Sequence, residues 1–345
     1  MNKKQKVIVG LSGGVDSSVS AYLLQQQGYE ISGVYMKLHN DIEGYHEKNI
    51  SAGKKVANFL NIEYEVLDLT KEFEKEVYDY FVNSYIDGTT PNPCVKCNRT
   101  IKFGALYDYA MSKNADFLAT GHYAKTDGEF IYCADDKTKD QSYFLGQIDK
   151  KVIPKLIFPM STYTKDEIRK IGEQIPALKE IASQKDSQEI CFVENEYTDI
   201  LQKHTNIDLQ GKTLDKDGNE VGHHKGYMHY TIGKRRGFYV HGAHEPHFVL
   251  AQDPKNNTIT VGKKADLAVR NVQVDNLNMF IDDNEFECGV KLRYRSQMIP
   301  CKVKIQDDKA TIELLEDAIG VASGQAAVFY DDQKVLGSGW IIKTS

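Results

Sequence analysis

The sequence has no stretch that approaches the roughly 20 consecutive apolar residues of a membrane-spanning helix. The apolar run that follows the basic N-terminus, residues 7–11, is too short for the core of a signal peptide. Prolines are few (8 in 345 residues), and 41% hydrophobic with 27% charged residues is an ordinary globular balance, which excludes wholesale disorder. We therefore expect a cytoplasmic chain that makes no contact with a membrane. Its length allows two or three domains.

Cysteine is also too sparse for a disulfide scaffold, since the chain has only 6, but in a reducing compartment some can be reactive or bind metal. Residues 91–98, PNPCVKCN, read as a stiff turn just before a helix over 99–111. A cysteine near that helix N-terminus, with Lys96 and Arg99 beside it, should have a lowered thiol pKa. The alternatives are a structural CxxC or half of a zinc site, although the sequence has no second CxxC.

The other cysteines give weaker signals. Cys191, in KDSQEICF, is by itself typical of an inert cysteine in a buried strand. Cys133, Cys288 and Cys301 lie in strand-like runs, and we interpret them as small buried hydrophobes.

Charge is uneven along the chain. The net charge of -6 argues against a generic nucleic-acid coat, yet residues 88–104, 223–239 and 289–304 contain bases and no acid. Such windows fit a polyanion, but charge alone favours solvated faces. Histidines gather between residues 223 and 247; their irregular spacing favours a loop near RNA, or plain surface, over a zinc site.

Strand and helix patterns alternate over the first 190 residues, including helices over 71–84 and 101–111. This alternation predicts a parallel sheet covered on both faces, with Leu11–Ser18, Met36 and Thr120–His122 gathered at the carboxyl ends of its strands. From about residue 206, short strands separated by turns, such as 288–294 and 301–305, predict one or two small barrels or sandwiches. We predict domains over 1–205, 206–267 and 268–345.

The segment SGGVDSS (residues 12–18) follows a strand and opens a helix. Its glycines allow a tight turn whose N–H groups can approach an anion, and the serine hydroxyls add donors. An ordinary glycine-rich turn with serine caps is the alternative, and the Gly-Lys-Ser/Thr ending of a Walker A loop is absent. The segment resembles the PP-loop of the ATP pyrophosphatase superfamily, a Rossmann-like fold that splits ATP into AMP and pyrophosphate. The resemblance implies Mg²⁺ and an ATP site lined by Gly10, Leu11, Ser12, Gly13, Gly14, Val15, Asp16, Ser17, Met36 and Gly121.

Eight motifs occur in order along the whole chain: SGGVDSS, TPNPCVKCNRTIKFG, ATGHYAK, KDQSYFL, KDSQEICFV, GHHKGYMHYTIGKRRGF, KLRYRSQMIPC and ASGQAAVFYDDQKVLGSGWI. Together they resemble the bacterial tRNA-specific 2-thiouridylase family. The resemblance implies an α/β PP-loop domain followed by two small β-rich domains, the last a β-barrel. It also implies a sulfurtransferase that replaces the C2 oxygen of the tRNA wobble uridine with sulfur.

The family's chemistry assigns roles to two cysteines. Cys191 would carry incoming sulfur as a persulfide, delivered by a cysteine desulfurase or a sulfur-relay protein. Cys97 would be the partner thiol that reduces the persulfide and pairs with Cys191. The reaction needs such parts, because ATP must convert the C2 oxygen into a leaving group and a persulfide supplies a soft nucleophile.

One residue departs from the family pattern: Cys94 stands where the family usually has Asp, a candidate acid or base. Cys94, Cys97 and Cys191 could alternatively hold a [4Fe-4S] cluster. The resemblance also implies contacts to the tRNA and its target base from Asn92, Pro93, Cys94, His122, Lys139, Asp140, Gln141, Arg293, Tyr294 and Gln325. Competing hypotheses are a PP-loop ligase acting on a small molecule and a tRNA-binding protein that has lost catalysis.

Overall fold

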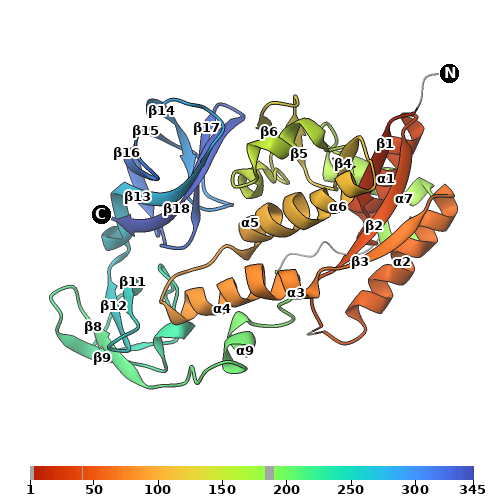
Figure 1. Cartoon of the computed structure of the whole chain (residues 1–345). Helices are drawn as coiled ribbons and strands as arrows, with labels where there is room; N and C mark the ends of the chain where they lie inside the picture. The colour runs from red at the N-terminus through yellow and green to blue at the C-terminus, as the bar shows by residue number, and fades with distance from the viewer. Residues whose placement is uncertain (1–3, 41, 183–189) are drawn as a thin grey trace. The chain divides into compact units, whose positions relative to one another are not determined.

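The computed structural model describes residues 4–40, 42–182 and 190–345 (Figure 1). The chain divides into two compact units, each assembled from three segments. Unit 1 comprises Met1–Val77, Cys94–Phe192 and Gln333–Leu336; unit 2 comprises Tyr78–Pro93, Val193–Asp332 and Gly337–Ser345.

Unit 1 is built on a five-stranded sheet in the order β3-β2-β1-β4-β7, and every pairing is parallel. Its strands are β1 (Lys6–Gly10), β2 (Glu30–Lys37), β3 (Tyr64–Asp68), β4 (Phe117–Ala119) and β7 (Leu156–Ile157). The central strand β1 has a fully buried core, Val7–Val9, as a strand covered on both faces requires. The predicted parallel sheet is confirmed.

Helices α1 (Val15–Gln26), α2 (Tyr45–Leu60), α7 (Lys165–Gln174) and α8 (Lys179–Ala182) share the core of unit 1 with this sheet. Val19 and Leu24 of α1 are fully buried beside Ile168 of α7. Helix α7 starts with a reciprocal capping box between Thr164 and Glu167, which fixes where its first residue, Lys165, lies.

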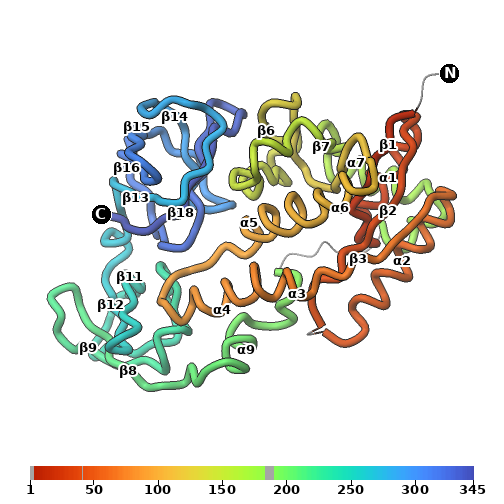
Figure 2. The backbone as a smooth tube through the Cα atoms, in the orientation of Figure 1, coloured from red at the N-terminus to blue at the C-terminus, as the bar shows by residue number. Residues whose placement is uncertain are grey.

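Two long helical stretches, labelled α3 with α4 and α5 with α6 in Figure 2, each contain a π-helical segment. The first runs through α3 (Thr70–Phe73), η1 (Glu74–Tyr78) and α4 (Asp79–Ile86); the second through α5 (Pro93–Cys97), η2 (Asn98–Ala105) and α6 (Leu106–Ser112). Both are longer than predicted. The second begins at Pro93 because proline suits the first position of a helix, where the missing N–H has no partner to lose.

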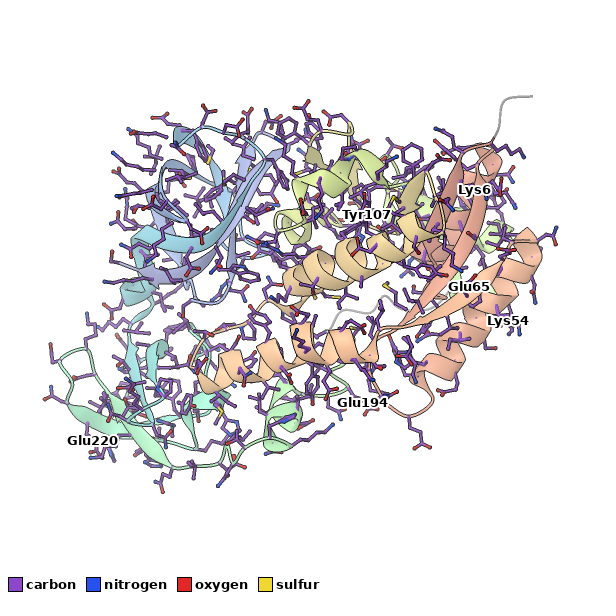
Figure 3. All side chains as sticks on the ribbon, in the orientation of Figure 1. Lys6, Lys54, Glu65, Tyr107, Glu194 and Glu220 are labelled. Atoms are coloured by element: carbon purple, nitrogen blue, oxygen red, sulfur yellow. The ribbon has the colours of Figure 1, made fainter. Side chains whose placement is uncertain are left out.

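Other short elements complete unit 1. The hairpin of β5 (Ala124–Thr126) and β6 (Ile131–Cys133) is joined by Lys334, which pairs with Tyr132 from the far end of the chain. The 3-10 turns η3 (Ser142–Leu145) and η4 (Lys150–Lys155) follow. On the edge strand, Glu65 (labelled in Figure 3) accepts hydrogen bonds from Tyr109 and Lys113 of α6 and ties that helix to β3.

Unit 2 contains a five-stranded sheet in the order β10-β9-β8-β12-β11. Its strands are β8 (Gly211–Leu214), β9 (Glu220–His224), β10 (Tyr239–Val240), β11 (Phe248–Asp253) and β12 (Thr258–Gly262). The 3-10 turn η5 (Tyr227–His229) and helix α9 (Tyr197–Gln202) lie in the same unit, where Tyr197 of α9 stacks on Tyr85 of α4 at 4.6 Å.

The last six strands of unit 2 close into a barrel in the order β13-β16-β15-β14-β17-β18, sealed by pairing of β13 with β18. They are β13 (Ala268–Met279), β14 (Glu285–Lys291), β15 (Ile299–Gln306), β16 (Lys309–Ile319), β17 (Ala326–Asp331) and β18 (Lys334–Thr344), preceded by η6 (Lys264–Leu267). The predicted barrel is confirmed. The strand predicted over 288–294 is wrong at its end, because β14 stops at Lys291 and residues 292–298 form the connection to β15.

In the part of the chain that the structure describes, no helix combines the length and hydropathy needed to cross a membrane. The domain boundaries predicted after residues 205 and 267 stay predictions.

Candidate functional site

Residues 11–14 join β1 to α1, and we call this connection the phosphate loop because its sequence resembles a PP-loop. Two serines, Ser12 in the loop and Ser17 in α1, organise it. The Ser12 N–H donates to Ser17 Oγ (3.1 Å), and the Ser17 hydroxyl donates to the Gly14 carbonyl (3.1 Å). Gly13 has φ +82, and a Cβ there would lie 2.5 Å from the Asn49 carbonyl oxygen of α2. Gly13 must therefore be glycine for both conformational and steric reasons.

Sequence reasoning missed the partners of Asp16, which lies in the first turn of α1. Lys165 donates from Nζ to both carboxylate oxygens of Asp16 (2.6 and 2.8 Å), and the Tyr123 hydroxyl donates to Oδ1 (3.0 Å). The Lys165 side chain is 9% exposed and that of Asp16 is 33% exposed. Because Lys165 lies 149 residues from Asp16, no local pattern could have indicated it.

The predicted gathering at the carboxyl edge of the sheet is confirmed for its central members. Strands β2 and β4 both pair in parallel with β1, so Met36, near the carboxyl end of β2, and Gly121, just after β4, lie at the same edge of the sheet as the phosphate loop. Gly121 approaches α1 so closely that a Cβ would lie 2.9 Å from the Ser17 nitrogen. A side chain at residue 121 would therefore displace the start of α1.

Cys94 and Cys97 lie within helix α5, not in a turn before a helix, so this part of the prediction is wrong. Their i, i+3 spacing puts them on neighbouring positions of one helical face. Cys94 is exposed and Cys97 is buried.

The predicted low thiol pKa is also wrong. Although Cys94 reaches solvent, the protein around its sulfur desolvates the thiolate and raises the pKa of Cys94. Burial raises the pKa of Cys97 to about 11. The nearby Lys102 ammonium lowers both pKa values but does not offset the effect of burial. The two cations named from the sequence are engaged elsewhere: Lys96 pairs with Glu76 (3.7 Å) and Arg99 donates to Gln147. Desolvation of the thiolate outweighs the charge and the helix terminus.

Lys102 is the cation that acts on the cysteines, and the π-helical segment η2 explains why. Lys102 lies five residues after Cys97. In an ordinary helix of 3.6 residues per turn, this spacing would put the two side chains on different faces of the helix. The wider π turn bonds i to i+5 and brings such residues back towards one face. Helical periodicity alone would therefore not place Lys102 near the cysteines.

Cys191 is exposed and lies in a turn, not in a buried strand; residues 185–189 of its motif lie outside the described residues. Desolvation raises the pKa of the Cys191 thiol to about 12, with further contributions from Cys97 and Cys94, opposed by Lys102. A thiol can reach solvent and still be surrounded mostly by protein, so the exposed area describes access and the pKa describes hydration of the thiolate. The three cysteines are therefore near enough to influence one another.

The described residues include no group of three His, Cys, Asp or Glu side chains placed to hold a metal ion. The cluster alternative on Cys94, Cys97 and Cys191 therefore stays a prediction.

His122 connects the cysteines to the phosphate loop. It is buried, and its Nδ1 lies 2.8 Å from Thr120 Oγ1 while its Nε2 lies 3.4 Å from Lys102 Nζ. Since an ammonium can only donate, Nε2 is the acceptor and Nδ1 carries the proton. Burial and the Lys102 charge hold the pKa of His122 well below its usual range, so the ring is neutral.

Two of the predicted tRNA contacts lie within unit 2, next to the start of α5. Asn92 is buried, and its N–H donates to the Tyr80 hydroxyl (3.3 Å). The Gln325 amide nitrogen donates to the carbonyls of Thr90 and Pro91, 3.0 Å each. Gln325 therefore holds the segment that leads into Pro93 and Cys94.

Two of the three residues of the KDQ motif (residues 139–141), Asp140 and Gln141, form hydrogen bonds within the protein. Asp140 is buried and accepts from the Ala134 and Ser142 N–H groups and from the Ser142 hydroxyl (2.9 Å). Gln141 exchanges bonds with the Tyr123 main chain, which fixes the residue whose hydroxyl reaches Asp16. Lys139 is half-buried.

Arg293 and Tyr294 lie in the connection 292–298, not inside a strand. The Arg293 guanidinium donates to the Ile232 carbonyl (3.4 Å), so unit 2 brings together parts of the windows 223–239 and 289–304. Arg235, Arg236 and Arg295 are exposed. This is the strongest candidate for a nucleic-acid surface within unit 2.

Basic residues in the windows 223–239 and 289–304 form more interactions within the protein than the sequence indicates. Register in the barrel places Glu285 opposite Lys304 and Glu287 opposite Lys302, with ion pairs of 4.0 and 3.5 Å. Lys234 donates to the His229 carbonyl and lies over the Tyr230 ring. Absence of acids along the chain did not mean absence of acids in space.

Histidines 223, 241 and 244 are exposed as predicted, but the prediction of plain surface is wrong for histidines 224 and 229, which are buried. Cys133 and Cys301 are buried as predicted; Cys288 is only half-buried.

A parallel sheet whose first strand ends in a glycine-cradled anion loop at the N-terminus of a helix defines an α/β domain of the HUP class. The family model described as tRNA methyl transferase HUP domain matches residues 5–195, followed by a tRNA methyl transferase PRC-barrel domain over 198–263 and an aminomethyltransferase beta-barrel domain over 269–341.

Two named relatives identify the family within this class. The chain is 61% identical over 342 residues to the tRNA-specific 2-thiouridylase MnmA 1 of Aliarcobacter butzleri, covering 99% of each chain. It is 53% identical to the tRNA-specific 2-thiouridylase MnmA of Sulfurimonas denitrificans, covering 98% of each. The chain belongs to the tRNA-specific 2-thiouridylase family.

Among solved structures, the U34-tRNA thiolase NcsA of Methanococcus maripaludis with its [4Fe-4S] cluster is 25% identical, with a TM-score of 0.36 over 58% of this chain and 64% of that one. A likeness of this extent supports no conclusion about the chemistry of the present chain.

Proposed function

We propose that the chain catalyses ATP-dependent 2-thiolation of the wobble uridine of tRNA through a persulfide on Cys191. One observation supports this most directly. Gly121 packs on the phosphate loop at Ser17, the next residue, His122, contacts Lys102, and Lys102 acts on Cys97 and Cys191. These contacts link the proposed ATP site to the two thiols within unit 1 and so support the proposal.

The proposed chemistry starts with activation of the base. The uridine C2 oxygen attacks the α-phosphorus of ATP, which releases pyrophosphate and leaves AMP bonded to that oxygen. The ATP-lining residues are Gly10, Leu11, Ser12, Gly13, Gly14, Val15, Asp16, Ser17, Met36 and Gly121. Mg²⁺, if bound with ATP, would offset phosphate charge. The Asp16 carboxylate, in the first turn of α1, is already paired with Lys165.

Sulfur transfer follows. The terminal sulfur of the Cys191 persulfide attacks C2 and AMP leaves, so that C2 is joined to Cys191 through two sulfur atoms. Cys97 then attacks Cys191 Sγ; the old S–S bond breaks, thiouridine departs and a Cys97–Cys191 disulfide remains. A thiol reductant returns both cysteines to thiols, and a persulfide-bearing desulfurase or relay protein reloads Cys191.

Lys102 has a specific part in this scheme. With pKa values of about 11 and 12, Cys97 and Cys191 are protonated in the free protein near neutral pH. Lys102 is the group that stabilises their thiolates, and the neutral His122 leaves its full charge available because the ring only accepts from it. The free site therefore keeps its thiols inert until substrates bind.

Residues 1–205 would carry the chemistry, while 206–267 and the barrel 268–345 would hold the tRNA. Asn92, Pro93 and Cys94 would face the target base after it leaves its stack. Arg293 and Tyr294 would contact the RNA from the connection 292–298. His122, Asp140, Gln141 and Gln325 would act mainly by positioning, since their polar atoms already bond within the protein. Lys139 would also contact the RNA. ATP, tRNA and reducing thiols together favour a cytoplasmic setting.

The test is thiolation of unmodified tRNA by anaerobically purified protein of measured iron content, with ATP and a sulfur donor. We expect iron-free protein to be active, with activity lost in Cys97→Ser and Cys191→Ser but kept in Cys94→Ser. Cys133→Ala is the matched control, because Cys133 is buried beside Ser142 and has no part in the proposed chemistry.

Other outcomes identify the competitors. Activity only with bound iron, lost also in Cys94→Ser, would replace the persulfide route by cluster chemistry. AMP formation that does not depend on tRNA would indicate a ligase for a small molecule, and tRNA binding without AMP formation would indicate lost catalysis.

A further inference from the structure

Two cysteines outside the proposed site lie side by side on neighbouring strands of the barrel. Cys288 of β14 is the direct register partner of Cys301 of β15, and their Sγ atoms are 3.6 Å apart. Directly opposed residues of an antiparallel pair have Cα atoms about 4.5–5.5 Å apart, inside the range that a disulfide spans. A disulfide requires the two sulfurs to approach from 3.6 Å to about 2.05 Å, a change to which rotation about the Cα–Cβ bonds contributes.

The two thiols differ in access and in protonation. Cys301 is 1% exposed, whereas Cys288 is half-buried, so a small reagent in solvent meets Cys288 first. The contact with Cys288, together with burial, raises the pKa of Cys301 far above its usual value. Cys301 thus stays a thiol whose sulfur lies in contact with the more accessible Cys288.

We propose that Cys288 and Cys301 form a reversible redox pair that a hydroperoxide converts into a disulfide. The Cys288 thiolate attacks the hydroperoxide, the O–O bond breaks, and Cys288 becomes a sulfenic acid while the alcohol or water departs. The Cys301 sulfur then attacks the sulfenic sulfur and a second water leaves. Two thiols give up two electrons to the peroxide, and an external dithiol reverses the change.

The bond would act on the connection 292–298, which joins β14 to β15 beyond the pairs Gly289–Pro300 and Val290–Ile299. Cross-linking Cys288 to Cys301 pins the register of the two strands that carry this connection, in which Arg293 and Tyr294 lie. Oxidation should therefore slow hydrogen exchange of residues 292–298. The pair is separate from the thiols of unit 1 and does not depend on the proposed thiolation.

The test uses the whole chain, reduced, freed of reductant, treated with hydrogen peroxide, blocked with iodoacetamide and digested with trypsin without reduction. Cleavage after Arg270, Lys291, Arg295 and Lys302 isolates Cys288 in peptide 271–291 and Cys301 in peptide 296–302. We expect a linked pair of these peptides that dithiothreitol abolishes. It should persist in the Cys97→Ser/Cys191→Ser variant, which removes the proposed catalytic thiols.

Variants of the pair separate the two steps. In Cys301→Ser, Cys288 should accumulate as a sulfenic acid that dimedone traps; in Cys288→Ser, Cys301 should stay a free thiol. The proposal is overturned if the linked peptides form only after unfolding in guanidinium chloride, or if Cys288 and Cys301 are both still alkylated when Cys191 is fully oxidised. Unchanged exchange of residues 292–298 in the linked protein would overturn the effect on the connection.

Discussion

Replacing Lys165 by Met removes the cation from the Asp16 carboxylate at the phosphate loop while keeping the length of an apolar side chain. Loss of one member of a fully buried ion pair costs about 3–5 kcal/mol, and of an exposed pair about 0–1 kcal/mol. The 9% and 33% exposure of Lys165 and Asp16 places this pair between the limits, because water can reach part of the carboxylate. The Tyr123 hydrogen bond also remains. We expect a loss of about 2 kcal/mol.

The assay is urea unfolding followed by two signals. Helical circular dichroism reports mainly unit 1, which contains α1, α2 and α7, whereas the chain's single tryptophan, Trp340, belongs to unit 2. With a slope of about 2–3 kcal/mol per M, the first transition should move down by roughly 0.7–1 M and the second should not move. Lys170→Met, an exposed lysine of the same helix, is the matched control and should change stability by less than about 0.5 kcal/mol.

A double-mutant cycle isolates the pair itself. Asp16→Asn in the Lys165→Met background removes the uncompensated charge, so the double variant should be more stable than the sum of the single losses by about 1 kcal/mol or more. Additive losses, or a Lys165→Met transition that coincides with that of the wild type, would refute the reasoning that Lys165 stabilises the loop through Asp16.

Two further predictions concern Lys102 and His122. Lys102→Met should raise the pKa of Cys191 further above about 12 and slow its alkylation by iodoacetamide across the alkaline range, since only the thiolate reacts; Lys96→Met should not, and equal slowing would contradict the assignment. Unfolded His122 takes a proton near pH 6.5 whereas the folded ring stays neutral, so the free energy of unfolding should fall below about pH 6.5 by up to about 1.4 kcal/mol per pH unit. His122→Asn should flatten this dependence in urea titrations; an unchanged slope would count against it.

The parallel sheet and the phosphate loop could be predicted because their signals are local. Buried strands read as short apolar runs, and the left-handed conformation of Gly13 demands glycine in the sequence. The carboxyl edge followed from topology alone, and it correctly brought Gly121 to the loop.

The errors arose where a partner comes from elsewhere in the chain. Cys97 was assigned a low thiol pKa from its neighbours in sequence, but burial by the folded unit decides its protonation. The window 289–304 appeared free of acids until antiparallel register placed Glu287 opposite Lys302. Lys102 was missed for a geometric reason, because a π-helical turn does not follow the period that sequence patterns assume.

The way the chain alternates between its two units sets an order of events during synthesis. Helix α4 belongs to unit 2, yet Tyr197, on which its Tyr85 stacks, is translated more than 100 residues later, a wait of roughly 10 s at about 5–20 residues per second. Unit 1 in turn receives Lys334, the partner of Tyr132, only when the ribosome has nearly finished. Neither unit is one continuous stretch of sequence, so a truncated chain leaves both units incomplete. In a nascent chain, α4 lacks its packing partner Tyr197 until that residue has been synthesised.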